Sequence, residues 1–244
     1  MRILLPPSEG KTPPASGPTL DLSILAYPEL TDARAAVVDE LIKVSRRDDA
    51  LAILKAGERI RPEVEAQREL WSLPCAPARE VYTGVLYEAA QLREGDDVTI
   101  FSGLFGATGG EDLIPAYRLS MNVKLPRAGA LKTYWRRHLK AEMFAAEVSE
   151  SATDAAYDPN QVTVDMRSGA YLVWNPPGPW WDVRVRDSSG KVITHMAKHY
   201  RGLLTRALLD AKSDDVAAVA RTLGTVEVDE DGLKRHLTLT PTDA

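Results

Sequence analysis

The residues best suited to bind an anion form a basic block between positions 113 and 141, a segment with no Asp or Glu. Its charged and aromatic residues are Arg118, Lys124, Arg127, Lys132, Arg136, Arg137 and Lys140, interleaved with Tyr117, Tyr134 and Trp135. The chain as a whole carries a net charge of −5. A local basic surface in an acidic protein attracts phosphates, nucleotides or nucleic acid. The alternative is that these charges are spread over several faces and only solvate them.

A second candidate is the loop Ser8-Glu9-Gly10-Lys11-Thr12, which follows a short apolar segment. It resembles the end of a phosphate-binding P-loop, but Leu5 stands where the GxxxxGK[ST] motif needs its first glycine. Two prolines then follow in place of a helix. We therefore reject an NTPase and keep a loop that presents Ser8, Lys11 and Thr12 to an anion.

Two further cations, Lys198 and Arg201, lie three residues apart and share one face of an expected helix. Gly202 is unusual inside a helix and indicates the close approach of another backbone or a ligand. His195 and His199 are spaced to hold a metal from one helix face, yet the glutamate of an HExxH motif is absent. We expect no metal site and keep iron binding at these histidines as a weaker alternative.

Other reactive groups have no evident partner. Glu111, Asp112 and Asp165 are possible general acids or bases, and the sequence supplies none of them with a second catalytic residue. The single cysteine, Cys75, excludes an internal disulfide and is typical of a structural thiol in a reducing compartment. The catalytic residues therefore stay unassigned.

The elements that must position these groups follow from hydrophobic periodicity. Strands are predicted over residues 2–5, 97–102, 162–165, 170–174, 183–186, 192–194 and 233–240. Helices are predicted over residues 32–45, 49–56, 62–71, 130–142, 197–210 and 214–223. This order lacks regular βαβ alternation and predicts an α+β or irregular α/β domain. Composition is that of a globular protein with no membrane-spanning or signal segment, so we expect a cytoplasmic location.

Several short motifs, in order along the chain, resemble the YaaA family of bacterial peroxide stress-response proteins. They are Ile-Leu-Leu-Pro-Pro-Ser-Glu-Gly-Lys-Thr from residue 3, Val-Tyr-Thr-Gly from 81, Ser-Gly-Leu-Phe-Gly from 102, Asp-Leu-Ile-Pro-Ala-Tyr-Arg-Leu-Ser-Met from 112, Tyr134-Trp135, and Ala-Lys-His-Tyr-Arg-Gly from 197. Each motif is weak alone, but the ordered set is specific and extends from residue 3 to about residue 206.

The resemblance implies one compact α+β domain over residues 1–244, with a mixed sheet, surrounding helices and a cantaloupe-type fold. It also implies a positively charged cleft, DNA binding and a role in limiting iron-driven oxidative damage. A helix-hairpin-helix element would fall near residues 33–57. This chain has no glycine in that turn, and Asp48 and Asp49 would repel phosphate, so Arg46 and Arg47 compensate only in part.

Polar and basic residues at the family-matching positions recur beside glycines and turns, where packing does not require them. We expect several of them to converge on one anion-binding cleft, and they are Ser8, Lys11, Thr12, Tyr82, Thr83, Ser102, Tyr117, Arg118, Lys198 and Arg201. The expected partner is DNA, duplex or distorted, read with little sequence specificity by a monomer without cofactors. The rival is an enzyme or binding protein for a nucleotide or another small phosphorylated ligand in the same cleft.

Overall fold

The computed structural model describes residues 1–140, 161–191, 194–211 and 213–242. Its strands are β1 (Arg2–Leu5), β2 (Ala76–Pro77), β3 (Val98–Ser102), β4 (Gly106–Gly109), β5 (Leu113–Ile114), β6 (Lys124–Leu125), β7 (Gly129–Ala130), β8 (Thr163–Asp165), β9 (Trp180–Val185), β10 (Gly224–Asp231) and β11 (Lys234–Pro241). Its α-helices are α1 (Thr31–Ser45), α2 (Ala50–Leu54), α3 (Arg61–Ala66), α4 (Ala78–Val81), α5 (Val85–Ala90), α6 (Leu131–His138), α7 (Thr194–Ala211) and α8 (Val216–Ala220).

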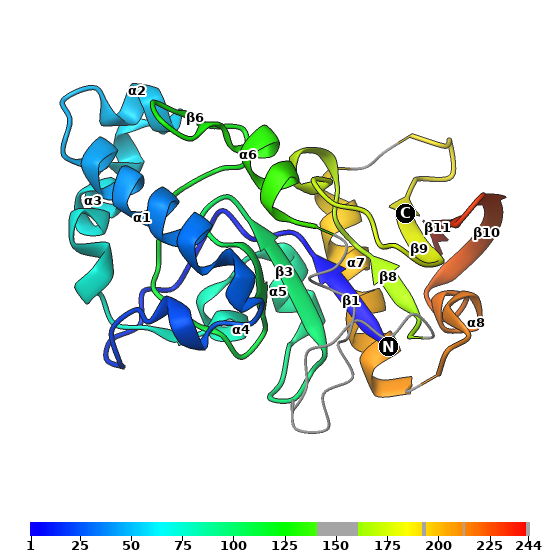
Figure 1. Ribbon diagram of the computed structural model, residues 1–244. Helices are drawn as coiled ribbons and strands as arrows, with labels where there is room; N and C mark the ends of the chain where they lie inside the picture. The colour runs from blue at the N-terminus through cyan, green and yellow to red at the C-terminus, as the bar shows by residue number, and fades with distance from the viewer. Residues whose placement is uncertain (141–160, 192–193, 212, 243–244) are drawn as a thin grey trace.

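One mixed sheet organises the molecule, with seven strands in the order β10-β11-β9-β8-β1-β3-β4 (Figure 1). β1 runs parallel to β3 on one side and to β8 on the other, and β9 and β11 extend the parallel set. β4 and β10 close the two edges in the antiparallel direction. The expected single domain with a mixed sheet and surrounding helices is confirmed.

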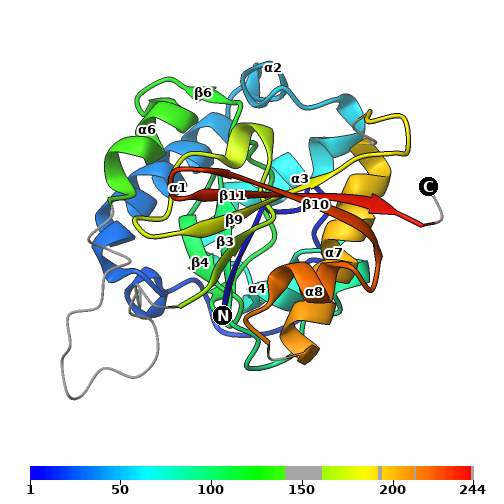
Figure 2. The ribbon, with the colours of Figure 1, turned by 90° about the vertical axis from the view of Figure 1, so that its right-hand side faces the viewer.

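Helices cover both faces of this sheet, as the view along its edge shows (Figure 2). α1 and α6 lie on one side, whereas α5 and α7 pack against each other on the opposite side. Gly202 explains the second packing, because a Cβ at that position would meet the carbonyl oxygen of Leu86 in α5 at 2.2 Å. The prediction of a close backbone neighbour at Gly202 is therefore confirmed.

Buried polar side chains fasten α1 and α6 to the sheet. Arg34 of α1 is fully buried and donates to the carbonyl oxygens of Phe105 (3.0 Å) and Ala107 (2.5 Å). Trp135 of α6 is also fully buried, and its indole N–H donates to the carbonyl oxygen of Gly103 at 2.9 Å. Both side chains thus bind the β3–β4 hairpin, whose backbone carbonyls they satisfy.

The structure corrects some predicted elements. The strand predicted over 170–174 is wrong, because this segment contains a single 3-10 turn, Gly169–Tyr171. The helix predicted over 62–71 is broken by the non-helical backbone of Glu69. Two strands of the seven-stranded sheet were not predicted. Glycines interrupt the strand pattern of β4, and acidic residues fill much of β10. Residues 192–193 lie outside the described part of the chain, and α7 begins directly after them. None of the described helices is long and apolar enough to cross a bilayer.

Candidate functional site

The candidate site lies at the carboxyl end of β1. The next two parallel strands in the sequence, β3 and β8, lie on opposite sides of β1, so the chain crosses over in opposite directions from this strand. Such a switch point leaves an open crevice at the carboxyl ends of the strands, where open α/β sheets bind their ligands. The loop containing Ser8, Lys11 and Thr12 leaves β1 at this point.

Backbone contacts hold this loop against the segment that follows α4. Lys11 forms a bridge with Tyr82, and Thr12 N–H donates to the carbonyl oxygen of Val81 at 2.9 Å. Ser8 Oγ accepts a hydrogen bond from Thr83 N–H at 3.0 Å. The structure therefore brings five of the expected residues together, although the Ser8 and Thr83 groups are used to shape the loop.

The ammonium of Lys11 sits in a largely desolvated position. Its Nζ donates to the carbonyl oxygen of Ser8 at 2.9 Å and lies 4.3 Å from the ring centroid of Tyr117 and 5.3 Å from that of Tyr82. Burial, and then the positive charge of Arg118, lower the pKa of Lys11 to about 7. Both effects disfavour the charged form of an amine. Close to neutral pH, a substantial fraction of Lys11 is therefore uncharged.

Tyr82 and Tyr117 form the floor beneath this amine. Their hydroxyls share a hydrogen bond of 2.7 Å, and Tyr87 stacks on Tyr82 with ring centroids 5.5 Å apart. Burial raises the pKa of all three phenols, so they stay neutral and supply no negative charge to Lys11. Ser102 is fully buried at the end of β3 and lies beside the hydroxyls of Tyr82 and Tyr117. These groups support the site from below.

Two cavities meet at Lys11. The first, the apolar pocket, encloses about 360 Å³ and is lined by Lys11, Pro13, Pro14, Pro62, Glu63, Ala66, Leu73, Pro74, Ala116 and Tyr117. The second, the basic pocket, encloses about 200 Å³ and is lined by Pro7, Ser8, Glu9, Lys11, Leu54, Lys55, Ala56, Gly57, Ile60, Arg118, Leu119, Ser120 and Tyr171. Three cations but only one carboxylate line the basic pocket, which suits an anionic ligand.

Arg118 and Lys55 are the two other cations of the basic pocket. The Arg118 guanidinium forms an ion pair with Glu63, and its backbone N–H donates to the side-chain oxygen of Gln67 at 2.9 Å. Lys55 ends α2 in a left-handed conformation, and its Nζ donates to the carbonyl oxygen of Asn122 at 3.1 Å. This contact joins the basic pocket to the start of β6.

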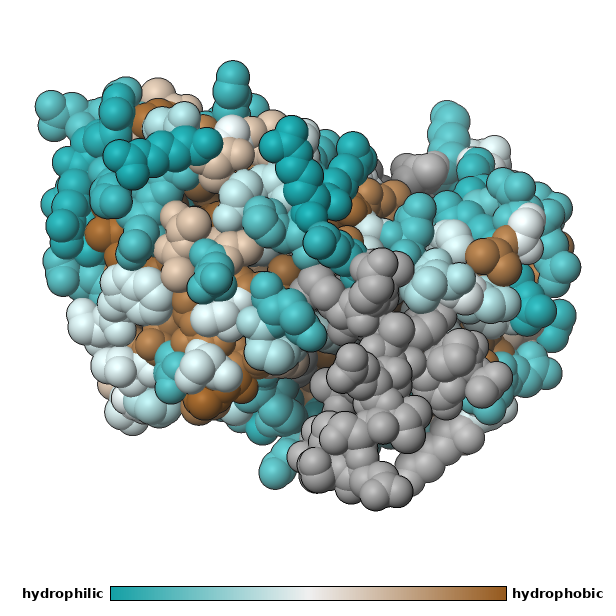
Figure 3. Space-filling model, in the orientation of Figure 1, coloured by the Kyte–Doolittle hydropathy of each residue, from teal (hydrophilic) through white to brown (hydrophobic). Residues whose placement is uncertain are grey.

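The rest of the basic block continues from there over β6, β7 and α6. Most of its cations are exposed, and we call them the basic surface: Lys124, Arg127, Lys132, Arg136, Arg137 and Lys140. Within the described residues, no ion pair involves Arg136 or Arg137. Hydrophilic side chains are frequent in the upper part of the molecule where these elements lie, with apolar ones between them (Figure 3). The block's aromatic residues do not add stacking faces, because Trp135 is buried and Tyr134 anchors α6 through Ala33.

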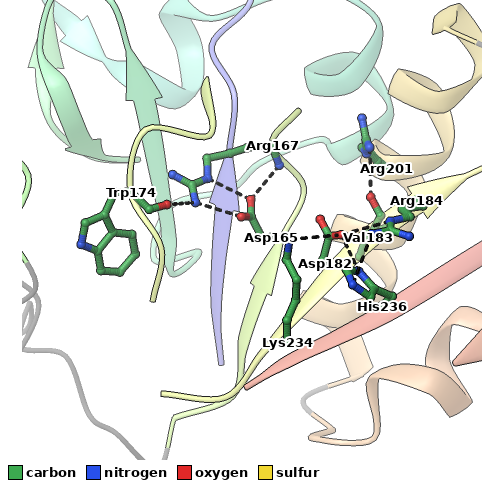
Figure 4. A network of polar contacts seen from close by, with 9 residues as sticks. All are labelled: Asp165, Arg167, Trp174, Asp182, Val183, Arg184, Arg201, Lys234 and His236. Atoms are coloured by element: carbon green, nitrogen blue, oxygen red, sulfur yellow. Dashed lines mark hydrogen bonds and ion pairs between the residues drawn. The ribbon is translucent and has the colours of Figure 1, made fainter. Parts of the chain in front are cut away.

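The structure does not connect Lys198 and Arg201 with Lys11 through any contact among the described residues. Lys198 is exposed on α7, whereas Arg201 points at β9 and donates to the carbonyl oxygen of Val183 at 2.9 Å (Figure 4). Its buried Nε has no hydrogen-bond partner in the described part of the chain. Burial lowers the pKa of Arg201, and the nearby Asp165 and Asp182 oppose that shift. Arg201 thus anchors α7.

A polar network crosses β8, β9 and β11 beside that anchor (Figure 4). Asp182 accepts from His236 Nδ1 at 2.8 Å, while Asp165 forms a two-armed ion pair with Arg167 at 2.8 and 2.9 Å. Arg167 also donates to the carbonyl oxygens of Tyr171 (3.4 Å) and Trp174 (2.7 Å). Since Tyr171 lines the basic pocket, this network holds one wall of the site in place.

The remaining candidates have structural partners. Glu111 pairs with Arg79 at 2.9 Å, and Asp112 accepts from the backbone N–H groups of Ala26 and Gly109. Cys75 is buried, and its pKa is raised to about 11 by that burial, which is typical of an unreactive thiol. No group of three potential metal ligands occurs in the described residues, and the His195 side chain lies outside them.

The turn between α1 and α2 matches the position expected for a hairpin but has its arginines engaged. Arg46 pairs with Glu69 at 3.2 Å, and Arg47 pairs with Asp49 at 2.7 Å. Exposed pairs of this kind are weak, so the arginines can exchange partners. Lys55, at the end of α2, is the cation of this region that lines the basic pocket. Sequence reasoning missed Lys55, Glu63 and Tyr171, because their approach to Lys11 depends on contacts between distant segments.

Comparison with known proteins identifies the family. A family model described as "Peroxide stress protein YaaA" matches residues 1–225. A UPF0246 protein of Corynebacterium efficiens is 40% identical over 98% of this chain and 99% of its own length. A UPF0246 protein of Streptomyces coelicolor is 38% identical over 86% of this chain and 83% of its own length, and an uncharacterized protein of Campylobacter jejuni is 26% identical over 98% of both chains. The chain therefore belongs to the YaaA family of peroxide stress proteins.

Proposed function

We propose that this peroxide stress protein binds DNA through the basic surface and the adjoining basic pocket, and thereby limits iron-driven oxidative damage to DNA. The observation that carries the proposal is the arrangement of cations. Arg118 and Lys55 line the pocket beside Lys11, which is only partly charged near neutral pH, and Lys55 lies against Asn122, two residues before Lys124. A continuous basic path of this kind follows a phosphate backbone, which supplies most of the affinity in sequence-independent binding.

The exposed α6 arginines make the strongest contribution to this path. Arg136 and Arg137 are both exposed, and no ion pair with another described residue has to break before they bind phosphate. Arg46 and Arg47 would each have to leave an acidic partner. We therefore assign the main phosphate contacts to α6 and β6 and a minor role to the α1–α2 turn.

Fluorescence anisotropy of labelled duplex, bubble and single-stranded DNA tests this assignment. The variant Arg136→Ala/Arg137→Ala should weaken binding to every form. The matched control is Arg221→Ala/Arg235→Ala, which removes the same charge near α8 and β11, away from α6 (Figure 1). Equal losses in both double variants would show that only net charge matters, and would contradict a defined DNA surface.

A second candidate function is supported by the small size of the basic pocket. About 200 Å³ lined by Lys11, Lys55 and Arg118 suits a phosphate group or a small phosphorylated ligand. A ligand that binds only the folded state raises the melting temperature. A thermal-shift series with nucleotides and sugar phosphates tests this candidate, with Lys55→Met as the variant that should lose the shift. Absence of any shift in the wild type would count against it.

A further inference from the structure

The amine of Lys11 occupies an unusual position for a lysine that only binds phosphate. It lines both pockets, it donates a hydrogen bond to the carbonyl oxygen of Ser8, and no ion pair with a carboxylate engages it within the described residues. A phosphate-binding lysine needs its charge, whereas burial and the positive charge of Arg118 lower the pKa of Lys11 more than the carboxylates of Glu63 and Glu9 raise it. The surroundings instead favour the free amine.

A free amine in a cavity is a nucleophile toward carbonyl carbon. Lysines become nucleophilic in this way when they are desolvated or placed beside another cation. Lys11 has both features, because the Tyr82 and Tyr117 rings cover its Nζ and Arg118 lies nearby. The resulting pKa of about 7 leaves the nucleophilic form well populated at neutral pH.

Resting on the DNA binding proposed above, we propose that Lys11 forms an imine with the aldehyde of a ring-opened deoxyribose phosphate at an abasic site in DNA. The Nζ lone pair attacks the C1′ carbonyl carbon, and the amine proton passes to the aldehyde oxygen to give a carbinolamine. The carbinolamine hydroxyl then leaves as water together with the second proton of the nitrogen, and the C=N bond forms. The step needs no oxidant, reductant or metal, and the reverse addition of water releases the sugar.

The two pockets suit such a substrate better than intact DNA. An abasic nucleotide has no base to unstack, so it leaves the duplex at low cost and can enter a cavity that a base pair cannot reach. Arg118 and Lys55 in the basic pocket are placed to hold the phosphate attached to the sugar, while Lys11 lies at the boundary with the apolar pocket. The same chemistry would accept a free sugar phosphate, and the experiment separates the two sources.

The test is reductive trapping with sodium cyanoborohydride, which converts an imine into a stable amine link. Wild-type protein is incubated with a labelled duplex that contains one abasic site, and in a parallel arm with 2-deoxyribose 5-phosphate. We expect a protein–DNA adduct that peptide mapping by mass spectrometry places on Lys11. Lys11→Arg should reduce the adduct at least tenfold, whereas Lys191→Met, which removes an exposed lysine that lines neither pocket, should still form it.

The pH dependence of the trapping rate distinguishes a reactive lysine from one that only supports the structure. The trapping rate should rise with pH through about pH 7 and level off roughly one to two pH units higher, because half of Lys11 is uncharged at its pKa and nearly all of it above that range. A rate that keeps rising toward the pKa of an exposed lysine, or an adduct mapped to other lysines, would overturn the proposal. If the free sugar phosphate is trapped in preference to the abasic duplex, the assignment of DNA as the source of the sugar would be overturned.

The proposal and the DNA-binding function fail separately. If the wild type binds an intact duplex but forms no adduct with the abasic one, the imine is refuted and DNA binding stands. If no duplex is bound and the free sugar phosphate is trapped on Lys11, DNA binding is refuted while the amine chemistry stands. Mapping the wild-type adduct needs no variant, so a folding defect in Lys11→Arg leaves the test intact.

Discussion

Replacing Lys11 by Met should change how the stability of the protein depends on pH. The folded-state pKa of Lys11 is lowered from 10.5 to about 7, so between these values the unfolded chain binds more protons than the folded one. Stability must then rise with pH in this window, because the penalty of burying an ammonium disappears as the amine loses its proton. Below about pH 7 both states are protonated, and the penalty is constant.

The expected magnitude follows from the size of that shift. Between about pH 7 and about pH 9 the unfolded lysine stays protonated while the folded one becomes neutral, which is worth about 2 kcal/mol of unfolding free energy. Urea denaturation at these two pH values measures it. Wild type should gain about 2 kcal/mol more than Lys11→Met on going to the higher pH, since other titrating groups cancel in the comparison.

Lys55→Met is the matched control, because Lys55 lies in the same pocket but is exposed. Its pH dependence should follow that of the wild type. Equal pH dependence of the wild type and Lys11→Met, within about 0.5 kcal/mol, would refute the claim that the site desolvates this amine.

Two further changes test the packing that holds the site. Gly202→Ala should destabilise the fold by about 2 kcal/mol or more, because the added Cβ would collide with the Leu86 carbonyl oxygen. A melting temperature equal to that of the wild type would contradict this close contact. Arg167→Ala should lower the free energy of unfolding by about 3–5 kcal/mol, because it leaves Asp165 buried without its ion pair. Denaturant unfolding measures this loss, and the double variant Asp165→Asn/Arg167→Met should recover part of it. No recovery in the double variant would show that the loss comes from the carbonyl contacts of Arg167 instead.

Local patterns predicted the central elements well. β1, α1 and β3 each carry a strong periodic or continuous apolar signal, and all three occur near their predicted positions. The prediction failed where local preference and tertiary context disagree. The acidic strand β10 is mostly exposed and is held by pairing with β11, so its own sequence carries little strand signal.

The candidate site shows the same division. Ser8, Lys11, Tyr82 and Tyr117 converge as expected, because loops beside parallel strands meet at one edge of the sheet. Arg201 faces β9 instead, since its helix turns it toward the Val183 carbonyl oxygen. The approach of Glu63 and Lys55 could not be predicted, because it depends on how α2 and α3 pack against a segment more than fifty residues away.

The salt dependence of duplex binding tests the central claim most directly. For each phosphate contact that is lost, the slope of log Kd against log salt should fall by about 0.9. Arg136→Ala/Arg137→Ala should therefore have a slope lower by about 2 than the wild type, while Arg221→Ala/Arg235→Ala should keep the wild-type slope. An unchanged slope in the α6 variant, or no duplex binding by the wild type at low salt, would contradict the account.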